Sequence, residues 1–288
     1  MKRVMCLLAL LMSLTFNALF MTTPGVSAIT YGFVDSNNTF SNTGAFVVKS
    51  ITTGQILPIC SGTMITSNVF LTAGHCTIAF NQDLALRGFS AYVSLDAAIP
   101  FGTFTSIQTN LLPVAYVVTN PNYTQRQNDP GDIGALILES PVVGITPATL
   151  AHCGLLDQLA DRNGLKNAVL TAVGYGVQER GVGQGSPSFQ DVNPVPRMYA
   201  FSSFNALNNG YIRLSQNPAK GDGGTCFGDS GGPDFLSVNG ERILVAITIT
   251  GDSVCRATNV DYRLDTISAQ GFLAYLNGSF GTSIPILC

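Results

Sequence analysis

The distribution of strand-forming segments constrains the fold of this chain more than any other feature. Seven short runs are β-branched or apolar and are bounded by turn residues: Ala45–Lys49, Thr63–Ile65, Val69–Leu71, Val114–Val118, Ile133–Leu138, Ala168–Val173 and Ile243–Thr250. Only 11% of the residues are charged and 30 are glycine, which is typical of a loop-rich β protein. Short strands separated by Gly, Asn and Pro turns indicate an all-β sandwich or barrel.

One helix is predicted near the C-terminus. Its apolar residues recur at roughly helical spacing, at Leu264, Ile267, Phe272 and Tyr275. Gly278 stands where a C-terminal cap is expected. The segment Gln178–Pro196 is rich in Gly, Pro and Ser and has no period, so we expect a long surface loop there.

Residues 1–28 have the pattern of a secretory signal peptide. Lys2 and Arg3 supply a positive start, an apolar run follows over residues 4–21, and Val26-Ser27-Ala28 offers small residues for cleavage. The alternative is an uncleaved membrane anchor, because the apolar run is near the lower length limit for spanning a bilayer. We expect export and removal of the leader, with no membrane attachment afterwards.

The mature chain is weakly acidic and retains an even number of cysteines. Loss of Lys2 and Arg3 lowers Lys+Arg from 14 to 12 against 17 Asp+Glu, so the net charge changes from −3 to −5, which argues against nucleic-acid binding. Six cysteines remain, at positions 60, 76, 153, 226, 255 and 288. An even count after a signal peptide predicts disulfides, although spacing alone does not select their pairing. No Cys-x-x-Cys or His-x-x-x-His pair is present, so we expect no metal site.

A glycine-rich string, Cys226-Phe227-Gly228-Asp229-Ser230-Gly231-Gly232-Pro233, places a serine between glycines and directly after an acid. A nucleophilic serine needs an exposed hydroxyl and nearby N–H groups aimed at a developing oxyanion. Glycines allow the backbone to turn its amides in that way. The alternative is a glycine-rich turn with a chance serine.

The chain contains two histidines, which differ in their surroundings. His75 lies in Thr72-Ala73-Gly74-His75-Cys76, directly after the predicted strand Val69–Leu71. His152 has no comparable context, and we expect it on the surface or in a loop. The sequence therefore favours His75 as the catalytic base of a nucleophilic serine.

Two acidic residues between His75 and Ser230 are candidates to orient the histidine. Asp132 leads directly into the apolar run Ile133–Leu138. Asp129 precedes Pro130 and has the position of a turn residue. The buried-strand pattern after Asp132 favours Asp132.

Several of these segments together resemble the trypsin/chymotrypsin-like serine proteases. The string Gly-Asp-Ser-Gly-Gly-Pro is similar to the nucleophile loop of that family. Residues 60–65 and 72–76 resemble its Cys-Gly-Gly-Thr-Leu-Ile and Thr-Ala-Ala-His-Cys motifs, and the segment from Asp132 resembles Asp-Ile-Ala-Leu. Residues 173–176 resemble Gly-Trp-Gly with Tyr in place of Trp. The order His, Asp, Ser is that of this family and differs from the orders in α/β-hydrolases and subtilisins.

The resemblance implies an all-β architecture and a domain plan. The expected fold is two six-stranded antiparallel β-barrels with the active site in the cleft between them, plus a C-terminal helix. Residues 29–288 would form the protease domain, with the first barrel at about 29–150 and the second at about 165–288.

The resemblance also implies catalytic roles and disulfide pairs. Ser230 would be the nucleophile, His75 the general base and then acid, and Asp132 the group that orients His75. The amides of Gly228 and Ser230 would form the oxyanion hole. The implied disulfides are Cys60–Cys76, Cys226–Cys255 and Cys153–Cys288. No cofactor or metal is implied.

Substrate preference is left open between two readings. In trypsin-like members of the family an Asp six residues before the nucleophile lies at the pocket floor, and this chain has Gly224 there. A carboxylate from another wall, Asp261, could pair with a basic side chain. Alternatively Asp261 points to solvent, and a pocket lined by Gly224, Thr225 and Gly251 takes an apolar or small residue, which is the reading we favour.

Activation is predicted to accompany export. In this family cleavage frees an N-terminal Ile-Val-Gly-Gly whose ammonium pairs with the Asp before the catalytic Ser. Cleavage after Ala28 would expose Ile29-Thr30-Tyr31-Gly32, and the corresponding carboxylate is Asp229. We therefore expect an Ile29–Asp229 activation pair. The alternative is a frayed Ile29, with another donor bound to Asp229.

The predicted function is a secreted serine endopeptidase that acts through an acyl-enzyme intermediate. Its expected partners are protein or peptide substrates and protein inhibitors, and the expected oligomeric state is a monomer. Two alternatives remain: a catalytically inactive homologue that serves as a binding module, and an esterase on the same fold.

Overall fold

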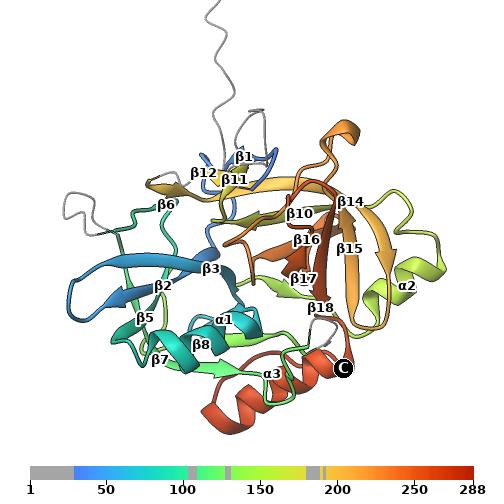
Figure 1. Cartoon of the computed structure of the whole chain (residues 1–288). Helices are drawn as coiled ribbons and strands as arrows, with labels where there is room; N and C mark the ends of the chain where they lie inside the picture. Colours follow the sequence, from blue (N-terminus) through green and yellow to red (C-terminus); the bar gives the residue numbers. More distant parts are fainter. Residues whose placement is uncertain (1–28, 103–108, 127–130, 180–188, 191–192) are drawn as a thin grey trace, which may run out of the picture.

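The computed structural model describes residues 29–288 except 103–108, 127–130, 180–188 and 191–192. Within these residues the strands form two closed six-stranded antiparallel barrels that lie side by side (Figure 1). The predicted all-β two-barrel fold is therefore confirmed. The predicted signal peptide, Asp129 and part of the predicted loop Gln178–Pro196 lie outside the described residues.

The first barrel closes in the order β2-β3-β4-β8-β7-β5. Its strands are β2 (Thr43–Ser50), β3 (Ile56–Met64), β4 (Val69–Thr72), β5 (Phe89–Ser94), β7 (Leu112–Thr119) and β8 (Gly134–Leu138). Closure depends on β2, which pairs with β3 on one edge and with β5 on the other. Phe46, Phe70 and Leu136 are fully buried in the core of this barrel, so its interior is packed with side chains.

The second barrel closes in the order β14-β10-β16-β17-β18-β15, with β15 pairing back to β14. Its strands are β10 (Val169–Gly174), β14 (Met198–Leu207), β15 (Tyr211–Ser215), β16 (Pro233–Val238), β17 (Glu241–Gly251) and β18 (Thr258–Arg263). Leu170, Leu214 and Val245 belong to its apolar core. Two acids, Asp234 and Asp261, are also fully buried in these strands.

Shorter elements connect and cover the barrels. The short strands are β1 (Phe33–Val34), β6 (Ala98–Ile99), β9 (Thr149–Leu150), β11 (Gln178–Glu179), β12 (Phe189–Gln190) and β13 (Val195–Pro196). The helices are α1 (Gly74–Ala79), a π-helical turn (Phe80–Leu84), α2 (Leu155–Asp161), a 3₁₀ turn (Pro218–Lys220) and α3 (Ile267–Phe280).

The predicted C-terminal helix is α3, although its end differs from the prediction. Thr266 caps the start, because its side-chain oxygen accepts a hydrogen bond from the Ala269 amide at 3.1 Å. The helix continues through Gly278 and ends at Gly281, which has φ +65°. A left-handed terminal residue is the usual position for glycine, so Gly281 takes the role predicted for Gly278.

Each end of the domain packs on the barrel to which its neighbouring strands do not belong. β1 pairs with β14, so the stretch from Ile29 to Val34 belongs with the second barrel, whereas the predicted first-barrel range of about 29–150 includes it. Conversely α3 covers the first barrel (Figure 1), and the Phe280 ring packs in a tilted arrangement against Tyr116 of β7 at a centroid distance of 5.2 Å. Each terminal segment therefore fastens one barrel to the other.

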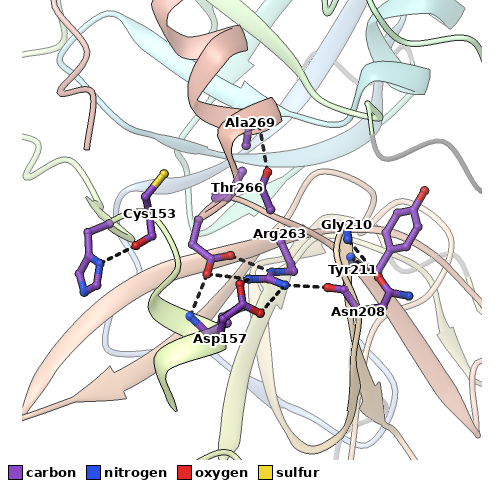
Figure 2. A network of polar contacts seen from close by, with 12 residues as sticks. Cys153, Asp157, Asn208, Gly210, Tyr211, Arg263, Thr266 and Ala269 are labelled. Carbon is purple, nitrogen blue, oxygen red and sulfur yellow. Dashed lines mark hydrogen bonds and ion pairs between the residues drawn. The ribbon is translucent and has the colours of Figure 1, made fainter. Parts of the chain in front are cut away.

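A buried ion-pair network holds α2 and the start of α3 to the second barrel. Figure 2 shows the Arg263 guanidinium between Asp157 and Asn208. Arg263 donates to both oxygens of Asp265 at 2.9 Å, to Asp157 at 2.8 and 3.1 Å and to the Asn208 carbonyl at 2.7 Å. The side chains of Arg263 and Asp265 are 2% and 0% exposed, whereas Asp157 is 62% exposed.

We expect Arg263→Met to destabilise the fold strongly. The substitution leaves the Asp265 charge buried without its partner, which typically costs about 3–5 kcal/mol. Asp157→Asn is the matched control and should cost less than about 1 kcal/mol, because Asp157 is largely in water. Urea unfolding with the disulfides intact measures both. Equal costs for the two variants would contradict this reading.

Within the described residues, no helix is both long and apolar enough to cross a bilayer.

Candidate active site

His75 and Asp132 are brought together by the pairing of β4 with β8. His75 lies in α1 just after β4, and Asp132 lies just before β8, where Thr72 pairs with Gly134. The His75 amide donates to Asp132 Oδ1 at 2.8 Å, and His75 Nδ1 lies 2.9 Å from Oδ2. Because a carboxylate only accepts, the proton of the neutral ring is on Nδ1, and Nε2 retains a lone pair.

Ser230 and His75 line the same cleft between the barrels. The cleft has a volume of about 340 Å³. Its lining residues come from the serine loop and the end of β17: Thr225, Cys226, Phe227, Ser230, Thr248, Ile249, Thr250, Gly251, Asp252, Ser253 and Cys255, together with His75. No hydrogen bond joins the described His75 ring to the Ser230 hydroxyl. Such contacts commonly tighten only when substrate binds.

Ser61, on β3 of the first barrel, holds the serine loop of the second barrel in place. The Ser61 amide donates to the Ser230 carbonyl at 2.9 Å, and the Ser61 hydroxyl donates to the Gly228 carbonyl at 2.9 Å. The same hydroxyl accepts from the Tyr175 amide at 2.9 Å. Ser61 belongs to the motif at residues 60–65, but the motif alone does not predict this contact, because the contact depends on packing across the two barrels.

The amides of Gly228 and Ser230 have no acceptor among the described residues. Gly228 has φ +96°, a conformation that L side chains rarely adopt. An oxyanion hole requires such a pair of free amides beside a serine, and Ser230 is partly exposed.

Asp229 is fully buried beneath this loop. Its carboxylate accepts from the Gly176 amide at 2.7 Å and from the Cys226 amide at 2.9 Å. Burial raises its pKa to about 7, against the effect of these two hydrogen bonds. A Cβ atom on either Gly174 or Gly176 would collide with the carboxylate, so the Gly-Tyr-Gly segment is needed for this close approach.

Ile29 is fully buried on the second barrel beside Met198 and Ala200. The next residue, Thr30, exchanges two backbone hydrogen bonds with Gly224, at 2.9 and 3.0 Å. Met198 pairs with Gly174, the residue that borders Asp229. The start of the described chain is therefore buried against β14 and hydrogen-bonded to Gly224 of the second barrel.

The residues predicted to form the substrate pocket divide into two groups. Thr225 and Gly251 line the cleft. Gly224 does not, and the Gln216 side chain occupies the space where a side chain at position 224 would lie. Asp261 is not a lining residue. It is 0% exposed inside the second barrel, so it neither forms a pocket wall nor points to solvent, and both readings of Asp261 are corrected.

Asp261 instead forms a carboxyl pair with Asp234. Both side chains are fully buried, and three of their four oxygens have no donor if both are ionised. Burial raises the pKa of Asp234 to about 7. Burial and then the charge of Asp234 raise the pKa of Asp261 well above its ordinary value. Two carboxyls in contact without a cation hold a shared proton, as a hydrogen bond between them requires.

This pair predicts a stability that falls as the pH rises. Because the folded-state pKa values are raised, the stabilisation is complete below the ordinary value of 3.8 and is lost as the pH rises through about 7. In Asp261→Asn, the amide donates to Asp234 without a shared proton, so the loss should be smaller. Urea unfolding between about pH 4 and 8 compares the two proteins. An unchanged slope in the variant would refute the assignment.

The described part of the chain contains three disulfides, Cys60–Cys76, Cys153–Cys288 and Cys226–Cys255. These are the pairs that the resemblance implies. Cys60, Cys76 and His75 place potential metal ligands within 4.8 Å of one another, but the disulfide leaves no thiolate to bind a metal. His152 lies away from the cleft, exposed, with its ring against the carbonyl of Cys153 at 3.1 Å.

Two barrels with a histidine–carboxylate pair and a serine at their junction define the class of two-barrel serine proteases. Residues 34–266 match the family model described as Trypsin. The match covers well over half of the chain, which therefore belongs to the trypsin family.

Proposed function

We propose that the chain is a secreted serine endopeptidase whose catalytic residues are Ser230, His75 and Asp132. The observation that carries this proposal is the double contact of Asp132 with the amide and Nδ1 of His75, on the wall of the cleft that also exposes Ser230. This arrangement leaves His75 Nε2 able to take a proton, which a serine nucleophile requires.

The reaction follows from these groups. Ser230 Oγ attacks the scissile carbonyl carbon while His75 Nε2 takes the hydroxyl proton. Asp132 stabilises the imidazolium that forms, and His75 then delivers the proton to the leaving amine. A water molecule then attacks the acyl carbon while His75 Nε2 takes its proton, and His75 returns this proton to Ser230 Oγ as the bond to the acyl group breaks.

The amides of Gly228 and Ser230 would bind the oxyanion of each tetrahedral intermediate. Their lack of acceptors among the described residues supports this role. One such donor typically contributes about 10²–10³ in turnover. Ser61 would act as a positioning residue for this pair, since it binds the carbonyl groups of Gly228 and Ser230.

A peptide substrate suits the surface on both sides of Ser230. On the far side of Gly228 lies an apolar hollow of about 250 Å³, lined by Leu57, Pro58, Phe101, Val177, Val195 and Phe227 with Tyr175, Gly176, Gln178 and Gly228. The cleft would hold the acyl side of the substrate and the hollow its leaving side. Protein inhibitors that present a similar segment would bind the same surface.

Cleavage after Ala28 would activate the enzyme by creating an ammonium group at Ile29 that pairs with Asp229. Two observations support this. Asp229 is buried with no cation among its described partners, which is costly for a carboxylate. Ile29 has φ +60°, a strained value for a β-branched residue, and cleavage of the preceding peptide bond removes that torsion.

The experiment is to purify the secreted protein, determine its N-terminus and incubate it with a peptide library, with and without an organophosphorus fluoride. We expect a chain that begins at Ile29, peptide-bond cleavage at a limited set of sites, and loss of that cleavage after inhibition. Hydrolysis of esters alone would favour an esterase. No hydrolysis and no labelling would favour an inactive binding module.

A further inference from the structure

The inner end of the cleft is formed by two threonines whose hydroxyl protons point away from it. Thr225 and Thr248 line the cleft but are only 5% and 4% exposed. Thr225 Oγ1 donates to Asn259 Oδ1 at 2.6 Å. Thr248 Oγ1 donates to Asp234 Oδ2 at 3.3 Å. Both acceptors belong to fully buried residues.

The direction of the Thr225 hydrogen bond is fixed by a backbone amide. Val260 N–H can only donate, and it donates to the same Asn259 oxygen at 3.1 Å. That atom is therefore the carbonyl oxygen of Asn259, and Thr225 must be the donor. The Asn259 nitrogen then donates to Thr248 Oγ1 at 3.5 Å. Each of these hydrogen bonds is therefore donated in the same direction, from Thr225 to Asn259, from Asn259 to Thr248 and from Thr248 to Asp234.

Each threonine hydroxyl has a single proton, so neither has one left for a group in the cleft. The two hydroxyl oxygens can still accept a hydrogen bond from a group in the cleft. Gln216 Oε1, which is buried against Gly224 next to Thr225 in the chain, also has no donor among the described residues, but Gln216 does not line the cleft. The inner end of the cleft is therefore rich in acceptors and poor in donors.

Three carboxyl groups lie in or near the cleft, and they differ in their access to a substrate. Asp252 lines the cleft, but four donors of the protein already bind it: the amides of Arg256, Ala257 and Thr258 and the Gln216 side chain. Asp234 and Asp261 lie behind the threonines and are fully buried. Thr225 and Thr248 therefore offer neutral oxygens to a substrate group, and Asp252 offers a carboxylate whose Oδ1 accepts three of these four hydrogen bonds.

We propose that Thr225 and Thr248 determine specificity, so that the cleft prefers a substrate side chain ending in a hydrogen-bond donor over a side chain of the same size without one. This inference rests on the proposed peptidase function and names the chemistry of the residue on the acyl side of the cleaved bond. A donor satisfies the buried acceptors. An apolar end leaves them unpaired and loses that interaction.

The test compares pairs of peptide substrates that differ only in the terminal group of that residue. The pairs are Gln with Met, Tyr with Phe, and Lys with norleucine, so that amide, phenol and ammonium donors are distinguished. We expect a higher kcat/KM for the donor member of each pair, by about tenfold or more in the pair that fits best. Equal or faster cleavage of the apolar members would overturn the inference.

Two variants assign the effect to Thr225. Thr225→Val has a similar shape without the hydroxyl and should reduce the preference towards equality, whereas Thr225→Ser should keep it. Titration of Ser230 with an organophosphorus fluoride normalises every rate to active sites. A donor preference that survives in Thr225→Val would refute the role of Thr225. An absence of both labelling and cleavage in the unmodified protein would instead refute the proposed peptidase function, and this inference with it.

Discussion

Ser230→Ala is expected to lower kcat by about 10⁶-fold, since loss of a triad serine has an effect of this order in serine proteases. The serine oxygen forms the covalent bond to the substrate, and alanine has no atom that can replace it. Ser230 is partly exposed rather than a packing residue, so folding and secretion should be unaffected. Peptide hydrolysis by purified protein, together with the yield of secreted protein, measures both expectations.

His75→Ala is the matched comparison for this prediction. It should lower kcat nearly as much, and the double variant should show little further loss, because the two residues act on the same step. Additive losses would mean that His75 and Ser230 work independently. Wild-type cleavage by Ser230→Ala would show that the catalytic residues are elsewhere.

Extra residues before Ile29 should lower activity by about 10²- to 10³-fold. The extension replaces the ammonium group by a neutral amide and leaves Asp229 without its cation, and loss of one partner of a buried ion pair typically costs about 3–5 kcal/mol. The oxyanion amides lie next to Asp229 in the chain, so the loss should fall mainly on kcat. The fold should remain intact, because Asp229 keeps the hydrogen bonds from Gly176 and Cys226.

The control uses the same molecule before and after processing. An extension that a site-specific protease removes just before Ile29 allows activity to be measured on one preparation in both states. Recovery of activity on removal supports the Ile29–Asp229 pair. Full activity with the extension in place would contradict it and would mean that the two backbone amides suffice for Asp229.

Local signals predicted an all-β chain and seven of its strands, whereas the two-barrel arrangement and the residues at its junction were predicted from the family resemblance. Each predicted strand run falls largely within an observed strand, because β-branched residues between turns specify a strand without distant information. Asp132 was separable from Asp129 because the strand that follows it is apolar. The pairing of β4 with β8 then brings Asp132 to His75. The family motifs predict the two residues together without predicting that strand pairing.

Other features could not be predicted because they depend on which side chains meet inside the barrel. The sequence offers Asp261 either as a pocket wall or as a solvent-exposed residue, yet Asp261 pairs with Thr248 between strands and lies against Asp234 in the barrel interior. Gln216 reaches the face of Gly224 from the end of β15, and no local pattern indicates this. The helices α1 and α2 were missed because six or seven residues are too few for a helical period to be recognised.

The most direct test of the catalytic assignment is the site of covalent labelling in the secreted, processed protein. An organophosphorus fluoride should react with one residue, and peptide mass spectrometry should locate the adduct on Ser230. Labelling should require His75 and be absent from Ser230→Ala. An adduct on another residue, or a processed protein that hydrolyses peptides while Ser230 remains unlabelled, would contradict the account.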